Sequence, residues 1–260
     1  MQHALVQAGL APFLAGLAVT LLLFKARLGG LAAAAGFVLT AWLIGEIQLE
    51  PLAVKRRLVV LALAAAALGL GIDLAFRPGR MTAYIMGVLF ACASLWVFGN
   101  ALMQRPPLPA FLFGGGIVLF VGWTVAFSAT LQGDSVRAGA AGLGLGLGVG
   151  GAAFALKAAP FWQFGLALGA ASAGFLVMQM LIRRRIDAGL VFCLTAGVLA
   201  SLVAAAALLN SRLRWIELAI LAMVPLAARL PVPALWTVAC GAAAAASAYV
   251  ASRGWPSWLQ

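Results

Sequence analysis

Charged residues are scarce in this chain of 260 residues. Only 9% of the residues are Asp, Glu, Lys or Arg and 65% are hydrophobic, whereas an average soluble domain has about 25% charged and about 45–50% apolar residues. A chain of this size would need many more charged groups to cover a surface that faces water, so the composition excludes a soluble globular protein. The lack of polar low-complexity runs excludes a disordered chain. A mean hydropathy of +1.10 predicts an integral membrane protein instead.

Residues that commonly hold metals or carry redox chemistry are also few. His3 is the single histidine, and Cys92, Cys193 and Cys240 fall one by one within apolar runs, with no CxxC pair. This pattern gives no support to a zinc site, to a haem with two histidine ligands or to a thiol-redox pair. The zinc-protease, nucleophile-elbow and phosphate-loop motifs are missing as well. We therefore expect no cofactor, no metal site and no enzymatic activity.

Long apolar runs dominate what is present. A bilayer core about 30 Å thick requires about 20 apolar residues for each helix, and one span with its loop takes roughly 25, so the length predicts about ten spans. The short connections carry turn residues, as in the Pro-Gly pair at 78–79. We predict an all-α, polytopic integral membrane helix bundle in a single transmembrane domain, 1–260. Its expected spans are 8–24, 28–45, 58–76, 81–103, 109–131, 138–158, 161–182, 189–209, 216–229 and 234–251.

Basic residues outnumber acidic ones by 17 to 6 and stand in clusters between the apolar runs. The largest clusters are Lys55–Arg57 and Arg183–Arg185, which we expect to attract anionic lipid headgroups at about 1 kcal/mol per residue. Clusters that flank apolar runs argue against nucleic acid as a partner. Assigned to alternate sides of a ten-span bundle, the basic residues divide 9 to 8, so the positive-inside rule does not orient the chain.

A weak internal repeat would explain this even division. The segment 105–110 (RPPLPA) recurs 124 residues later as 229–234 (RLPVPA). With five spans in each unit, the second copy would be inverted in the membrane, as in many secondary transporters, and the halves would be 1–131 and 138–260. The alternative is that basic turns follow spans throughout the chain and match by chance.

Polar side chains within the spans are the default functional candidates, because burying them in lipid is costly. The candidates for a solute path or a polar core are Asp73, Asn100, Gln163 and Gln179. Asp73 precedes Arg77 by four residues, the spacing of an interfacial ion pair; the alternative is a carboxylate linked to a substrate or a proton. The amides are alternatively hydrogen-bonding contacts between helices. Glu217 falls in the first turn of the ninth expected span, where it complements the helix N-terminus.

Glycines recur at helical spacing in the sixth and seventh expected spans. The candidates for close helix packing are Gly142, Gly146, Gly150, Gly165 and Gly169, and Gly144 and Gly148 form a second stripe on nearly the opposite side of the sixth span. Smooth faces let neighbouring helices approach closely, so we expect the sixth span to be central. The alternative is a helix that slides or unwinds beside a solute path, because each glycine weakens a helix by about 1 kcal/mol relative to alanine.

These features favour a small-solute permease whose path lies between two helical halves. The alternative is a non-catalytic scaffold or assembly subunit of a larger membrane complex, which would also have few polar core residues and smooth helices. We expect a multi-pass protein of the bacterial inner (plasma) membrane, with a retained first span and no cleaved signal peptide. A membrane-protein partner and a homo-oligomer are both left open.

Overall fold

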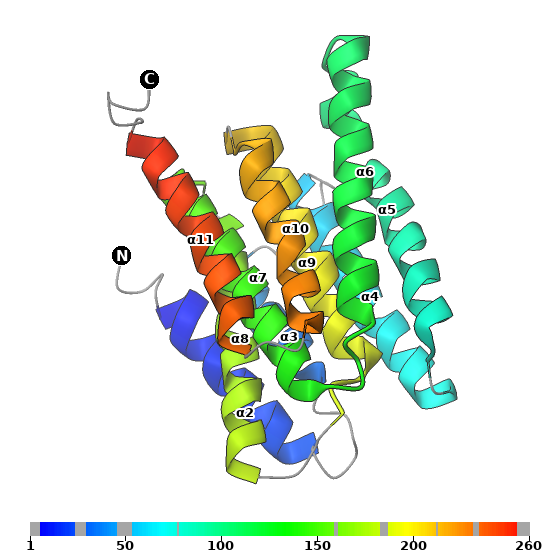
Figure 1. Ribbon diagram of the computed structural model, residues 1–260, viewed down its shortest axis with the longest axis vertical. Coiled ribbons are helices and arrows are strands. Elements are labelled where there is room, and N and C mark those ends of the chain that lie inside the picture. Colours follow the sequence, from blue (N-terminus) through cyan, green and yellow to red (C-terminus); the bar gives the residue numbers. More distant parts are fainter. Residues whose placement is uncertain are drawn as a thin grey trace.

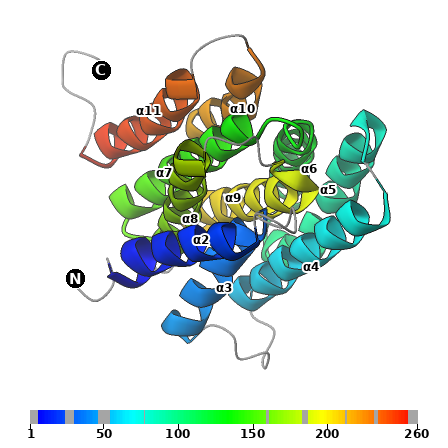
Figure 2. The same cartoon turned by 90° about the horizontal axis from the view of Figure 1, so that it is seen from below.

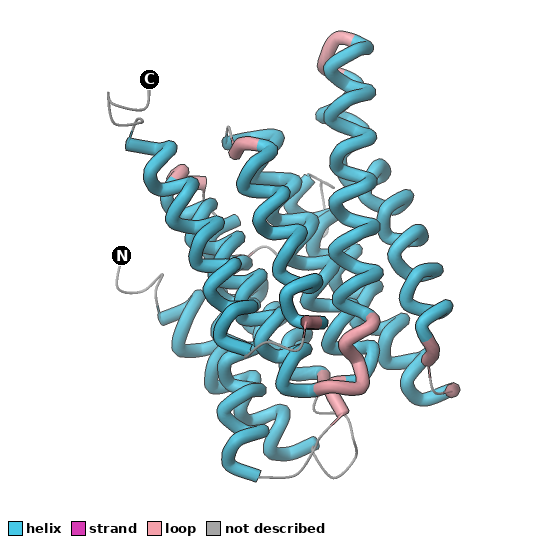
Figure 3. The backbone as a smooth tube through the Cα atoms, viewed as in Figure 1, coloured by secondary structure: helices cyan, strands magenta, loops and turns pink. Residues whose placement is uncertain are grey.

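The computed structural model describes residues 6–23, 30–45, 54–76, 78–158, 161–182, 187–211, 213–230 and 234–253. Within these ranges the chain forms ten α-helices and no strand, so the prediction of an all-helical protein is confirmed (Figures 1 and 3). A short π-helical segment, Val6–Leu10, leads into the first α-helix. The α-helices are α2 (Ala11–Leu23), α3 (Leu31–Ile44), α4 (Val54–Ala75), α5 (Arg80–Met103), α6 (Pro107–Ala129), α7 (Ser135–Ala155), α8 (Phe161–Ile182), α9 (Gly189–Ser211), α10 (Trp215–Arg229) and α11 (Ala234–Arg253).

Each of the ten expected spans falls on one of these helices, in the same order. The bounds differ by a few residues, most clearly at α4, which begins at Val54 and not at residue 58. The basic cluster Lys55–Arg57 therefore lies in the first turn of α4, not in the loop before it. Apolar periodicity marks the lipid-facing part of a helix and does not show how far the helix continues into polar sequence.

Seven of the described helical segments are long and apolar enough to cross a membrane: Val6–Leu23 and the helices α4 to α9. Two shorter apolar helices, Leu31–Ile44 and Leu235–Val250, lie in α3 and α11. Large apolar side chains point outward from several helices, such as Leu119, which is 75% exposed, and Met180, which is 80% exposed. An outer surface of this kind suits contact with lipid and not with water. The chain thus has the features of a multi-pass membrane protein, and the count of ten spans stays a prediction.

Helix α9 lies in the middle of the bundle, with α4, α6, α7 and α8 packed around it (Figure 2). Residues 190–208 are buried without exception. A helix with no exposed face has to be apolar all round, and α9 meets this requirement with Leu, Val, Ala and Phe on every side. Its few polar groups are satisfied locally: the Thr195 hydroxyl donates to the Val191 carbonyl at 2.7 Å, and the Ser201 hydroxyl donates to the Val198 carbonyl at 3.1 Å.

Charged side chains from other parts of the chain bind both ends of α9. At its N-terminus, Asp73 of α4 accepts hydrogen bonds from the backbone amides of Leu190 and Val191, each at 2.9 Å. At its other end, Arg105 in the α5–α6 turn donates through Nη2 to the Leu209 carbonyl at 3.2 Å. An acid at the N-terminus and a base at the C-terminus complement the helix dipole. They also pair end groups that have no partner within the helix and that a buried helix cannot expose to water.

Helix α7 packs between α8 and α11, with which it makes its most extensive contacts. On one face, a Cβ added at Gly146 would overlap the backbone nitrogen of Gly169, and one added at Gly150 would lie 2.6 Å from the Leu166 nitrogen. On the other face, a Cβ at Gly148 would lie 2.9 Å from the Gly241 carbonyl oxygen. Glycine is needed on both faces because the neighbouring backbones occupy the space that a side chain would take.

Helix α10 contains Pro225 and runs alongside α6. The Trp123 indole Nε1 of α6 donates to the Ala222 carbonyl of α10 at 3.0 Å. Near the start of α10, the Trp215 ring fills the space over Gly116, where an added Cβ would lie 2.5 Å from it. Helix α6 begins nine residues before Gly116, so at 1.5 Å per residue it continues about 14 Å beyond the start of α10. This overhang is visible where α6 rises above α10 (Figure 1).

The two predicted repeat halves do not pack alike in every respect. In an inverted repeat of five helices, α3 would correspond to α8 and α4 to α9. Both of these pairs are in contact, as such a repeat allows. The extensive contact of α7 with α11 has no counterpart of similar extent between α2 and α6. The internal repeat stays a prediction.

Candidate functional site

The four polar residues predicted to line a path do not converge on one site. Asp73 lies in the last turn of α4 and is half-buried. Gln163 and Gln179 lie at opposite ends of α8, 16 residues apart, which corresponds to about 24 Å along the helix. Gln179 is buried beside a mainly apolar groove between α7, α8 and α11, whereas Asn100, in the last turns of α5, is exposed. Of these four residues, Asp73 is the one that lines a polar cavity.

Asp73 joins α4 to α9 through both of its carboxylate oxygens. Oδ1 accepts from the Leu190 amide and Oδ2 from the Val191 amide. Hydrogen bonds to an ionised group are roughly twice as strong as neutral ones, so this carboxylate is a firm link between the two helices. Arg77, the partner that the sequence predicts for Asp73, lies outside the described residues.

A glycine at the start of α9 makes this link possible. Gly189 has a φ of +71°, a conformation that favours glycine. A Cβ at this position would lie 2.6 Å from Asp73 Oδ2. The chain therefore needs glycine here both for its backbone conformation and for the room that the carboxylate occupies.

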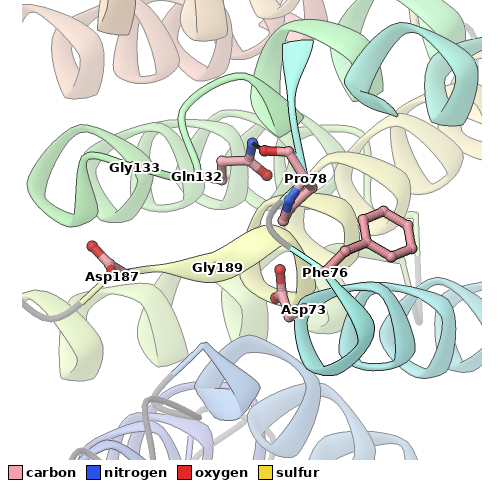
Figure 4. Close-up of a pocket in the computed structure, with 7 residues that line it drawn as sticks. All are labelled: Asp73, Phe76, Pro78, Gln132, Gly133, Asp187 and Gly189. Carbon is pink, nitrogen blue, oxygen red and sulfur yellow. Dashed lines mark hydrogen bonds between the residues drawn. The ribbon is translucent and has the colours of Figure 1, made fainter. Parts of the chain in front are cut away.

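A cavity of about 490 Å³ opens beside Asp73 (Figure 4). It is formed by the end of α4, the α6–α7 turn and the start of α9, and it is lined by Asp73, Phe76, Pro78, Gln132, Gly133, Asp187 and Gly189. Gln132 bridges its walls: Nε2 donates to the Pro78 carbonyl at 2.6 Å, and the backbone carbonyl of Gln132 accepts from the Gly189 amide at 3.3 Å. The Gln132 Oε1 atom is buried and has no hydrogen-bond partner.

The polar lining of this cavity consists mainly of hydrogen-bond acceptors. Two carboxylates, Asp73 and Asp187, and the unpaired amide oxygen of Gln132 border it. None of its seven described lining residues is basic, although basic residues exceed acidic ones almost threefold in the chain. Acceptors in this arrangement suit a cation or a solute with hydrogen-bond donors. Among the described residues, no group of three or more His, Cys, Asp and Glu side chains could hold a metal ion.

A second polar cluster lies where α6, α7 and α10 end or begin. Asp134 caps α7, its Oδ1 accepting from the Arg137 amide at 3.2 Å, and its Oδ2 pairs with Arg137 Nε at 3.2 Å. Arg137 also donates to the Arg229 carbonyl at 3.2 Å, and Arg229 Nε donates to Thr130 Oγ1 at 2.9 Å. This cluster ties helix ends together and borders no part of the Asp73 cavity.

Several basic residues thus bind protein groups and do not only face lipid. Arg57 donates to the Trp96 carbonyl at 3.0 Å, and its guanidinium lies 5.4 Å from the centre of the Trp96 ring. Lys55 and Arg56 are half-buried beside it, and the second predicted lipid-binding cluster, Arg183–Arg185, lies outside the described residues. The structure supports contact with a bilayer through its apolar helices; the preference for anionic headgroups stays a prediction.

Sequence reasoning missed Gln132, Asp187 and Gly189 as parts of a site. The segment 132–135 is recognisable as a turn, and Asp187 follows a basic triplet, so both read as loop residues with no chemistry of their own. Their relation to Asp73 depends on contacts between residues more than 50 positions apart, which no local pattern encodes.

Comparisons with known proteins give no further guidance to this site: no protein-family model matches the chain, and no curated protein and no solved structure matches it either.

Proposed function

We propose that this chain is a multi-pass membrane protein that carries a small solute, and that the cavity beside Asp73 is the opening of its path. The long apolar helices are compatible with an integral membrane protein, and solute transport is the step that we add. The observation that carries the proposal is a cavity of about 490 Å³ that is lined by two carboxylates. Its volume lies within the range of about 300–1,000 Å³ that is typical of small-molecule sites.

The lining favours a solute that donates hydrogen bonds, such as a small organic amine. Asp187 is exposed at the cavity, and Oε1 of Gln132 has no hydrogen-bond partner. Asp73 is different, because its oxygens already hold the N-terminus of α9. A solute that binds Asp73 competes with these two amides and loosens the contact between α4 and α9. Binding at the opening would in this way be coupled to a movement of the central helix.

Transport assays with purified protein in liposomes test this proposal. We expect uptake of at least one labelled amine from a size series of primary amines, and no uptake of carboxylic acids of matched size. Asp187→Asn should raise the KM for that amine, because it removes a charge from the lining. Asp134→Asn is the matched control: this carboxylate is about half exposed, lies on the same side of the bundle and does not line the cavity. Equal effects of the two substitutions would contradict the assignment of the cavity.

The second candidate function is a non-catalytic scaffold or assembly subunit. Its support is the close packing around α9, whose residues 190–208 are buried throughout. A scaffold would co-purify with a fixed stoichiometry of a partner after mild extraction from its native membrane, and its variants at Asp187 would behave like wild type. A protein that is recovered alone and takes up an amine would exclude this alternative.

A further inference from the structure

Two hydroxyl groups buried in α6, those of Thr124 and Ser128, have no hydrogen-bond partner among the described residues. The two residues are 0% and 3% exposed. Five other buried hydroxyls donate to a carbonyl of their own helix three or four residues earlier, as serine and threonine in helices commonly do; they belong to Thr20, Thr40, Ser94, Thr195 and Ser201. A buried hydroxyl that lacks a partner is costly, so two of them one turn apart point to a ligand that binds them.

Both hydroxyls lie on the face of α6 that packs on the central helix, α9 (Figure 2). Thr124 and Ser128 are four residues apart and therefore share one face of α6. A Cβ added at Gly197 of α9 would lie 3.3 Å from Ser128 Oγ. Ser128 thus faces a position on α9 that carries no side chain.

Helix α6 runs antiparallel to α9, and contacts join the two helices at both ends. Just after α6, the Gln132 backbone carbonyl accepts from the Gly189 amide, at the start of α9, at 3.3 Å. Just before α6, Arg105 donates to the Leu209 carbonyl, at the other end of α9, at 3.2 Å. Gln132 and Gly189 line the cavity of about 490 Å³. Ser128 therefore lies at the end of α6 that borders this cavity.

The antiparallel arrangement adds a third hydroxyl to the pair. Four residues back along α6 from Ser128 correspond to four residues onward along α9 from Gly197, which brings Thr124 level with Ser201. The Ser201 hydroxyl donates to the Val198 carbonyl at 3.1 Å, and its oxygen can still accept a hydrogen bond. We call Ser128, Thr124 and Ser201 the hydroxyl seam. It leads from the cavity into the bundle between α6 and α9.

We propose that the hydroxyl seam is the next binding site on the solute path, where its oxygens accept hydrogen bonds from the ammonium group of an amine that has passed the cavity. This inference rests on the proposed transport function. Three hydroxyl oxygens match the three donors of a primary ammonium group. Uncharged oxygens replace the hydration shell of cations in ion-selective filters, where binding has to be weak enough for the ion to leave. The hydroxyls of the seam suit passage in the same way.

The seam is closed in this structure. A Cβ added at Gly197 would lie 3.2 Å from Ser128 Cβ and 3.3 Å from Val125 Cα, so the two helices touch and leave no room for a solute. The seam opens when α9 moves away from α6. A solute that competes for Asp73 frees the start of α9 from α4, which makes this movement easier. Gly197 then allows α9 to return to close contact, because it has no side chain that would hold the helices apart.

Cysteine labelling in liposomes tests the seam without a transport measurement. Ser128→Cys and Thr124→Cys are treated with 2-aminoethyl methanethiosulfonate, a thiol reagent that carries an amine, and peptide mass spectrometry reads the label at the introduced residue. Ser172→Cys is the matched control: Ser172 of α8 is equally buried and has no hydroxyl partner among the described residues, but it faces Gly142 of α7. We expect both seam positions to react roughly tenfold faster than the control. A rate at either seam position that does not exceed the control rate would overturn the proposal.

Uptake assays separate this proposal from the proposed function. If the wild type takes up an amine, Ser128→Ala and Thr124→Val should each raise its KM about fivefold, the effect of one lost hydrogen bond, and Ser172→Ala should leave the KM unchanged. An unchanged KM in either seam variant would overturn the proposal and leave the transport function standing. If no amine is taken up, the transport proposal fails, and the labelling rates still decide whether an amine reaches the seam.

Discussion

Replacing single glycines of α7 by alanine tests whether this helix is packed as closely as the structure shows. Three variants form a graded series: Gly146→Ala against α8, Gly148→Ala against α11, and Gly115→Ala in α6 as the control. Nothing lies within 4 Å of a Cβ added at Gly115. All three positions are inside helices, so the gain in helix propensity, about 1 kcal/mol, is the same for each.

The expected magnitudes differ because the neighbours differ. At Gly146 the new Cβ meets the backbone of Gly169, which cannot rotate away, so an overpacking cost of about 3 kcal/mol exceeds the gain and leaves a loss of about 2 kcal/mol. At Gly148 the Cβ lies 2.6 Å from Leu221 Cδ2, which can move, and 2.9 Å from the Gly241 carbonyl oxygen, which cannot. A cost of about 2 kcal/mol there leaves a net loss of about 1 kcal/mol. Gly115→Ala should instead gain up to about 1 kcal/mol.

Thermal unfolding in one detergent, followed by loss of helical circular dichroism, measures this order. At about 2–4 °C for each kcal/mol in a protein of this size, Gly146→Ala and Gly115→Ala should differ in Tm by about 6–12 °C, with Gly148→Ala between them. A Gly146→Ala protein with a Tm at or above that of Gly115→Ala would refute the packing of α7 on α8.

Three further predictions address other parts of the bundle. Asp73→Asn should lower the free energy of unfolding by about 2 kcal/mol, because the asparagine side chain offers one neutral acceptor oxygen and leaves the other α9 amide without an acceptor; chemical denaturation measures this, and an unchanged midpoint would contradict the link between α4 and α9. Trp123→Phe should cost about 1 kcal/mol, because the hydrogen bond from the indole to the Ala222 carbonyl is lost; an unchanged midpoint of chemical denaturation would count against this contact between α6 and α10. Cysteines introduced singly at Gln104 and at Gly133, which precede and follow α6, should react with an impermeant maleimide from opposite sides of the membrane; labelling of both from one side would show that α6 does not cross.

The helices could be predicted from the sequence because two local signals agree. Apolar runs of membrane-spanning length alternate with turn residues, and both depend on residues that are close in the chain. The glycine stripes of α7 also depend only on nearby residues, since glycines at helical spacing leave a helix face without side chains. The structure places a neighbouring helix on each of these faces.

The arrangement of the helices could not be predicted in the same way. In a membrane protein, helices that face lipid and helices that face protein are both apolar, so the apolar sequence of α9 does not reveal that it is enclosed. The partners of Asp73 and Arg105 lie 117 and 104 residues away along the chain. Such pairings follow from the packing of whole helices, and the spacing of Asp73 and Arg77 points to a nearer partner than the amides that Asp73 binds.

The enclosed position of α9 has a consequence for the biosynthesis of the protein. Chains enter the membrane from the N-terminus onward, so α4, α6, α7 and α8 are made before the helix that they surround. Until residue 211 has left the ribosome, Asp73 and Arg105 lack the end groups that they bind in the finished protein. The first seven α-helices must therefore be less tightly packed at first, and they pack around α9 after it is inserted. A nascent chain that stops before Gly189 should be a substrate for membrane proteases, whereas one that extends past Ser211 should resist them.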